Sequence, residues 1–134
     1  MKVDGACHCG ALAISAEIDL TTVRVCHCTD CQVLSGAAYT VNVQVLPGTF
    51  AITRGKPKTY TRTAESGRKR SHGFCESCST RLYSASVGDE VISYNLRVGT
   101  LAQRKQLTPV LQYWVCSSLP WVEDLRGIEK LEKQ

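Results

Sequence analysis

Seven of the eight cysteines in this chain are gathered in three short motifs. The motifs form two outer pairs, Cys7-x-Cys9 and Cys75-x-x-Cys78, and one cysteine triple, Cys26-x-Cys28-x-x-Cys31. Thiolates separated by one or two residues can converge on a single tetrahedral ion from one turn of the chain, so these spacings are typical of zinc sites. The sequence therefore predicts that the cysteines bind metal.

The N-terminus and the hydropathy of the chain predict a reducing compartment, where cysteines bind metal more often than they form disulfides. The N-terminus MKVDGACHCG has no apolar core of a signal peptide, and no apolar run approaches the roughly 18 residues needed to span a bilayer. We therefore expect a cytoplasmic protein with no membrane partner. In a reducing compartment thiols stay free to ligate metal.

The cysteine triple is the unusual group, because a structural zinc ion usually takes four protein ligands. If the two outer pairs meet in space, they complete a four-thiolate site, and the triple keeps one coordination position open, as in catalytic zinc sites. Other possibilities remain open: His8, His27 or Cys116 closes a second structural site, or there is no second metal. The middle residue of a tight C-x-C motif usually points away from the metal, and Cys116 in the apolar run QYWVC is typical of a buried small residue.

An open three-thiolate zinc site favours thiol chemistry. Three thiolates leave the zinc centre with one net negative charge, which weakens its ability to ionise water. A soft substrate thiol is a better fourth ligand, and its sulfur could then attack a small aldehyde. His27 and Tyr39 are candidate proton donors. Arg24, Arg68 and Arg70 are candidates to bind the carboxylates of a glutathione-like thiol.

The formal net charge of +4 is unevenly spread. Residues 54–81 carry eight bases against two acids. The bases of this basic strip are Arg54, Lys56, Lys58, Arg62, Arg68, Lys69, Arg70 and Arg81. The strip is either a solvated hairpin or an electropositive wall for an anionic ligand. Only Tyr60 and Phe74 could stack on bases within it, which disfavours nucleic acid, although a zinc-stabilised module that binds nucleic acid or another acidic partner remains the alternative function.

The predicted fold is mostly β, with short antiparallel sheets and small helical turns in a single domain, residues 1–134. The strand candidates are residues 11–18, 39–45, 50–53, 58–63, 81–87, 91–96 and 110–115. In YTVNVQV, residues 39–45, apolar and polar residues alternate strictly, which predicts a half-buried strand. Short helical pieces are expected directly after Cys28 and near the C-terminus.

Three segments resemble the signature motifs of the glutathione-dependent formaldehyde-activating enzyme (GFA) family, which includes centromere protein V domains. They are GACHCGAL, CHCTDCQVLSGAAY and GFCESCSTRLY. The resemblance covers roughly residues 3–100, and LPWVEDL near residues 119–125 is similar to a Trp-containing segment of the family. Two departures are Ser79, where the family usually has Gly, and the absence of a His after His72.

The resemblance implies a zinc-stapled β-tent domain with two zinc ions per chain. The structural ion would be held by the outer pairs and the catalytic ion by the triple, with Cys26, Cys28 and Cys31 as the catalytic residues. The implied activity is that of a carbon–sulfur lyase resembling S-(hydroxymethyl)glutathione synthase, which joins or releases a small aldehyde such as formaldehyde and a glutathione-like thiol. Both partners would be small molecules.

Overall fold

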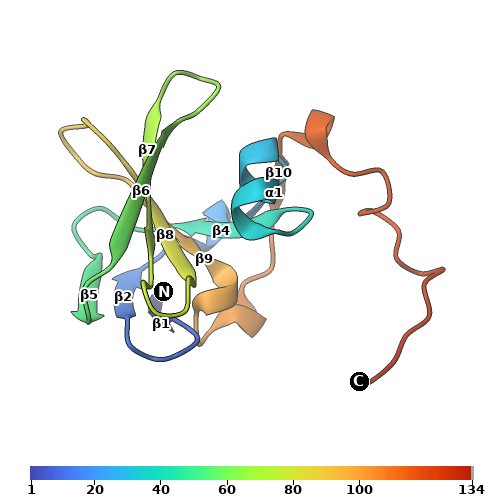
Figure 1. Ribbon diagram of the computed structural model, residues 1–134, viewed down its shortest axis with the longest axis horizontal. Helices are drawn as coiled ribbons and strands as arrows, with labels where there is room; N and C mark the ends of the chain where they lie inside the picture. The colour runs from blue at the N-terminus through green and yellow to red at the C-terminus, as the bar shows by residue number, and fades with distance from the viewer. Residues whose placement is uncertain (134) are drawn as a thin grey trace.

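Two β-sheets dominate the computed structural model, which describes residues 1–133 (Figure 1). The first sheet has the order β1-β2-β5, with β1 (Lys2–Ala6), β2 (Ala13–Glu17) and β5 (Ala51–Arg54). The second has the order β10-β3-β4-β9-β8-β7-β6. Its strands are β3 (Arg24–Cys26), β4 (Thr40–Gln44), β6 (Lys58–Thr63), β7 (Lys69–Phe74), β8 (Arg81–Ser86), β9 (Tyr94–Arg97) and β10 (Leu111–Tyr113). The prediction of a mostly β fold with antiparallel sheets is confirmed, and among the strand pairs of residues 1–133 only that of β10 with β3 is parallel.

The helix expected after Cys28 is confirmed as α1 (Thr29–Ser35). Its N-cap is Cys28 itself, whose sulfur accepts a hydrogen bond from the backbone N–H of Cys31. The helix ends at Gly36, which adopts the left-handed conformation that glycine tolerates best (φ 64°). The remaining helical pieces are the 3-10 turns η1 (Leu20–Thr22), η2 (Val98–Thr100), η3 (Arg104–Gln106) and η4 (Val115–Ser117).

The prediction of a helix near the C-terminus is wrong. Residues 118–133 contain turns and bends but neither helix nor strand, and they run away from the sheets (Figure 1). Pro120 and Gly127 interrupt the segment, and a short isolated helix gains too little from propensity alone to form in water. Within residues 1–133, no helix has both the length and the hydropathy required to span a membrane.

The hydrophobic core lies between the two sheets. Val3 and Ile14 come from the small sheet and are 1% exposed, whereas Val43, Leu82 and Leu96 come from the large sheet and are fully buried. On the large sheet, Gly73 of β7 lies under the ring of its cross-strand neighbour Tyr83. A Cβ at Gly73 would fall 2.2 Å from that ring, so only glycine fits there.

The three strands that sequence patterning missed, β1, β3 and β7, share a weak apolar signal. KVDGA contains two charged residues and a glycine, RVC is three residues long, and KRSHGF has Phe74 as its only large apolar residue. The alternation in residues 39–45 did predict the buried Val43 and Val45, but Thr40 and Asn42 on the opposite face are also only 6% and 5% exposed. Polar side chains therefore line a second, covered face of the large sheet.

Candidate metal centres

The outer cysteine pairs meet in space and form a four-cysteine cluster. Cys7 and Cys9 lie in the loop after β1, and Cys75 and Cys78 lie in the loop after β7. All four sulfur atoms lie within 4.8 Å of one another, with Cys7–Cys9 and Cys9–Cys75 sulfur separations of 3.6 and 3.7 Å. Two sulfurs bound at about 2.3 Å to one tetrahedral zinc ion would lie about 3.8 Å apart. The cluster therefore fits a zinc ion and is far too open for disulfides, whose sulfurs are about 2.05 Å apart.

The two loops that carry this cluster are closed in the same way. The backbone N–H of Cys7 donates to the carbonyl of Leu12 at 2.9 Å, and that of Cys75 donates to the carbonyl of Thr80, also at 2.9 Å. The loops are also joined to each other, because the N–H of His8 donates to the hydroxyl of Thr80. Backbone hydrogen bonds therefore fix the shape of each loop, and each loop presents two thiolates to the same point.

Each loop also contains one residue with positive φ, namely Gly10 at 77° and Ser79 at 58°. Left-handed backbone is free for glycine but costs other residues about 1 kcal/mol or more. Ser79 therefore stands at a backbone position that suits glycine best. The turn keeps its shape in this chain at the expense of local strain.

The cysteine triple is assembled from the end of a strand and the start of a helix. Cys26 ends β3, Cys28 caps α1, and Cys31 lies in the first turn of α1. Their sulfurs lie within 4.8 Å of one another, and the Cys26 and Cys28 sulfurs are 3.6 Å apart. In residues 1–133 neither His27 nor Cys116 joins this group. The donor set suits zinc, with three protein ligands.

None of the three side chains considered as a fourth ligand joins the triple within residues 1–133. His8 lies in the loop after β1, and the other two also point elsewhere. His27 is fully buried, and its Nε2 is hydrogen-bonded to the amide oxygen of Gln112 at 2.7 Å. Because residues of a strand alternate in direction, His27 shares its side with Val25 and lines a different cavity, together with Tyr39. The expectation that Cys116 is buried is wrong, because it is exposed in η4 beyond the edge of the sheet.

Within the triple, the surroundings favour the thiolate at Cys31, whereas burial raises the pKa of Cys28. Hydrogen bonds from Cys26 and Thr40 and the positive charge of Arg97 lower the pKa of Cys31 to about 5, although burial opposes the shift. The same hydrogen bond to Cys31 raises the pKa of Cys26. The three thiols are therefore not equivalent, and Cys31 is the one that ionises first.

The register of the large sheet places polar side chains in rows beside the triple. Paired residues of neighbouring strands share a face of the sheet. The rows of this polar sheet face are Tyr113–Cys26–Thr40, Arg24–Asn42–Arg97, Asn95–Ser84–His72 and Ser86–Arg70–Arg62. The polar face that patterning missed is thus the wall of the candidate site.

Four arginines converge on this face: Arg24, Arg62, Arg70 and Arg97. Three of them have uncharged hydrogen-bond partners: Arg24 donates to Asn95, Arg97 to Asn42 and Arg70 to Ser93. Arg62 forms an ion pair with Asp30 of α1. Burial and then repulsion from Arg24 lower the pKa of Arg70, which shows how closely the cations are held.

His72 of β7 lies among these arginines. It is 3% exposed, and neither ring nitrogen has a hydrogen-bond partner within the described residues. Burial, followed by repulsion from Arg97 and Arg62, lowers its pKa to about 4. The imidazole is therefore neutral at pH 7, with an N–H to offer a ligand.

Two cavities flank the cysteine triple. The first, called the arginine cavity, has a volume of about 150 Å³ and is lined by Cys26, Cys31, His72 and the four arginines. The second, called the outer cavity, measures about 250 Å³ and is lined by Cys28, Arg68 and Trp114. Arg62 and Arg70 line both. The triple therefore has access to ligands from two sides.

The candidate substrate-binding residues are only partly those expected from the sequence. Arg24 and Arg70 do line the arginine cavity, and Arg68 lines the outer one. His27 and Tyr39, expected as proton donors, line neither cavity, whereas His72 and Arg97 were not foreseen. The available signal was the polar alternation in KRSHGF and YNLR, which is readable only once these segments are known to be strands.

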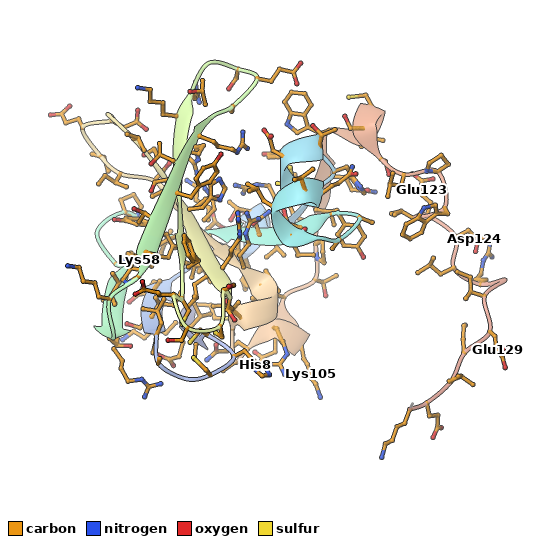
Figure 2. The ribbon with its side chains drawn as sticks, in the orientation of Figure 1. His8, Lys58, Lys105, Glu123, Asp124 and Glu129 are labelled. Carbon is orange, nitrogen blue, oxygen red and sulfur yellow. The ribbon has the colours of Figure 1, made fainter. Side chains whose placement is uncertain are left out.

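The basic strip turns out to face two ways. Arg62 and Arg70 are half-buried and turn to the cavities, whereas most of the other bases are exposed. Figure 2 shows Lys58 pointing away from the sheets, and it pairs with exposed Glu76 at 3.2 Å. The strip is therefore a solvated hairpin that contributes Arg62, Arg68 and Arg70 to the two cavities.

Comparison with known proteins identifies the family to which this chain belongs. A sequence model of the family described as glutathione-dependent formaldehyde-activating enzyme matches residues 2–117. Among solved structures, the chain is similar to a Rhodobacter sphaeroides protein determined as a Northeast Structural Genomics target, with 21% identity and a TM-score of 0.63 over 81% of this chain and 98% of that one. No curated protein matches the chain. Since the family match spans both cysteine clusters, the chain belongs to the glutathione-dependent formaldehyde-activating enzyme family.

Proposed function

We propose that this chain is an enzyme that forms or cleaves the bond between a thiol sulfur and the carbonyl carbon of a small aldehyde. The reaction takes place at the cysteine triple, and the four-cysteine cluster holds a structural zinc ion. The proposal rests on the inequality of the two clusters: one has four sulfurs, and the other has three sulfurs facing two arginine-lined cavities. Membership of the family supports aldehyde–thiol chemistry.

The residues of the triple suit a zinc ion, which Cys26, Cys28 and Cys31 would hold. When bound there, zinc supplies an open coordination position that keeps a substrate thiol ionised near neutral pH. The chain supports this arrangement by binding the second zinc at the remote four-cysteine cluster. That cluster fixes the loop after β7, and it therefore also holds β7 in place, with its side chains Arg70 and His72.

The remaining side chains bind and orient the reactants. Arg68 and Arg70 line the outer cavity beside Cys28 and can pair bidentately with the carboxylates of a glutathione-like thiol. As the carbon–sulfur bond forms, the thiol proton ends on the carbonyl oxygen, so the product is a hemithioacetal and no electrons leave the pair of reactants. The neutral ring of His72 can donate a hydrogen bond at this site.

Binding of a thiol tests the proposal directly. Glutathione should bind the zinc-loaded protein and release about one proton near pH 7, whereas S-methylglutathione should bind much more weakly. The lost metal–thiolate contact outweighs the roughly 0.8 kcal/mol gained from one extra methyl group. Calorimetry in two buffers of different ionisation enthalpy counts the protons. Equal affinity for the two peptides would rule out thiolate capture.

Catalysis is measured separately by exchange NMR on mixtures of formaldehyde and glutathione. The unmodified protein and Cys116→Ser, which changes an exposed cysteine outside both clusters, should accelerate exchange between free and adduct forms. Cys28→Ser should not. If no small thiol binds and nucleic acid binds tightly with a steep salt dependence, the chain is instead a zinc-stabilised binding module.

A further inference from the structure

The arginine cavity holds more positive charge than the metal centre can neutralise. Three thiolates and one divalent ion carry about one net negative charge, and Asp30, the partner of Arg62, adds another. Four guanidinium groups therefore exceed the negative charges around the cavity by about two. Within residues 1–133, the ion pairs of the structure give no carboxylate to Arg24, Arg70 or Arg97.

The arrangement of these cations is costly in the absence of a ligand. Arg62 and Arg70 lie directly opposite each other in the β6–β7 pair, a position where like charges repel. His72, in the same cavity, buries both ring nitrogens without a hydrogen-bond partner. Buried polar groups of this kind are normally satisfied, so the unpaired donor and the excess charge both indicate an anionic ligand.

The size of the cavity limits this ligand to a small molecule. Its volume of about 150 Å³ corresponds to roughly five water molecules at about 30 Å³ each, well below the 300 Å³ or more of sites for drug-sized ligands. A tripeptide thiol does not fit inside it. The larger outer cavity beside Cys28 is the place for the body of such a thiol.

We propose that the aldehyde substrate of this enzyme is glyoxylate, which carries a carboxylate directly on its aldehyde carbon, and that the arginine cavity binds this carboxylate beside Cys26 and Cys31. This inference rests on the proposed carbon–sulfur chemistry and specifies its electrophile. The thiol sulfur bonds to the aldehyde carbon, the carbonyl π electrons move to oxygen, and that oxygen receives the thiol proton. The product is a 2-hydroxy-2-thio acid, formed without oxidation or reduction.

Glyoxylate and glycolaldehyde make a matched test, because both have two carbons and only the first is charged. Titration calorimetry of the zinc-loaded protein should show glyoxylate binding at least tenfold more tightly than glycolaldehyde. With glutathione as the thiol, adduct formation should favour glyoxylate over both glycolaldehyde and formaldehyde by a similar factor. Loss of a charge-assisted contact is worth roughly tenfold to a hundredfold.

The variant Arg70→Gln tests the cavity itself. Removing one of two facing cations relieves repulsion, so the fold should survive, and the preference for glyoxylate should fall at least tenfold, with Arg70→Lys restoring part of it. Arg54→Gln, an equal change of charge at an exposed position on β5, should leave the preference unchanged.

The possible failures are distinguishable. Adduct formation from formaldehyde without any preference for glyoxylate would overturn this inference and leave the proposed function standing. A preference for mercaptoacetate over 2-mercaptoethanol, with none for glyoxylate, would show that the thiol carries the anion and would also overturn it. No adduct from any aldehyde would overturn both proposals.

Discussion

The two cysteine clusters use the same ligand atoms in different surroundings. In the four-cysteine cluster, two similar loops from β1 and β7 each contribute a pair of thiols, and backbone hydrogen bonds close each loop. In the triple, all three thiols come from one continuous stretch of residues 26–31, and side chains from β6, β7 and β9 surround them. The first arrangement joins distant parts of the chain, whereas the second collects distant parts around a local group.

We therefore propose that the surroundings, rather than the ligand atoms, separate the structural role of one cluster from the chemical role of the other. A cluster built from two remote loops gains its stability by closing the fold. A cluster built from one turn forms without contacts between distant segments, and its open side is available to substrates. Four predictions test this contrast, beginning with the largest expected effect.

Cys75→Ser should abolish the fold. Binding of structural zinc contributes on the order of 10 kcal/mol or more, comparable to the entire stability of a domain of this size. We expect an insoluble protein or one without a cooperative thermal transition by circular dichroism. Cys116→Ser is the matched control and should melt like the unmodified chain. A soluble Cys75 variant with native-like melting would show that the outer cluster is not a staple.

Cys28→Ser should keep the fold and lose one metal ion. The triple lies within a single turn, so its metal does not hold remote segments together. We expect the zinc content measured by elemental analysis to fall from about two ions per chain to about one, with a native circular dichroism spectrum. The contrast between the clusters fails if the intact chain binds a single zinc ion, or if this variant unfolds as Cys75→Ser does.

His72→Asn should flatten the dependence of stability on acid pH. The folded pKa of His72, about 4, lies below the unfolded value of about 6.5. The unfolded chain therefore binds more protons between these values, and stability falls as pH drops through this window. Urea unfolding with excess zinc should show a loss between pH 7 and pH 5 that is about 2 kcal/mol larger for the unmodified chain than for the variant. Identical losses of stability in the two proteins would show that the pKa of His72 is not lowered in the folded state.

Ser79→Gly should stabilise the protein slightly. Glycine removes the left-handed strain at φ 58° but adds unfolded-state entropy, so a net gain of about 0.5 to 1 kcal/mol is expected. The control Ser66→Gly changes an exposed turn serine that has no positive φ and should give no gain. Denaturant midpoints measure both. A Ser79→Gly protein no more stable than the control would contradict the strain in this loop.

Much of the fold class and the grouping of the cysteines into two clusters were readable from the sequence, for a local reason. The spacing of Cys26, Cys28 and Cys31 lies within one turn, and the alternation in residues 39–45 predicted the buried Val43 and Val45. Patterning failed at β7 and β3, because their polar side chains point into a covered site and not to solvent. The C-terminal helix failed because Pro120 and Gly127 interrupt residues 118–133, and most side chains of this segment are exposed and gain little from packing.

The sequence by itself determined the candidate ligand atoms, their grouping into pairs and a triple, and the mostly β character, since these depend on neighbours within a few residues. Only the tertiary structure decided that Arg24, Arg62, Arg70 and Arg97 meet at one cavity with His72. Those residues lie on four different strands, and the pairing register between strands brings them to the same face. Register is set by packing across the whole sheet, and a shift of one residue on any strand would turn its side chain to the other face.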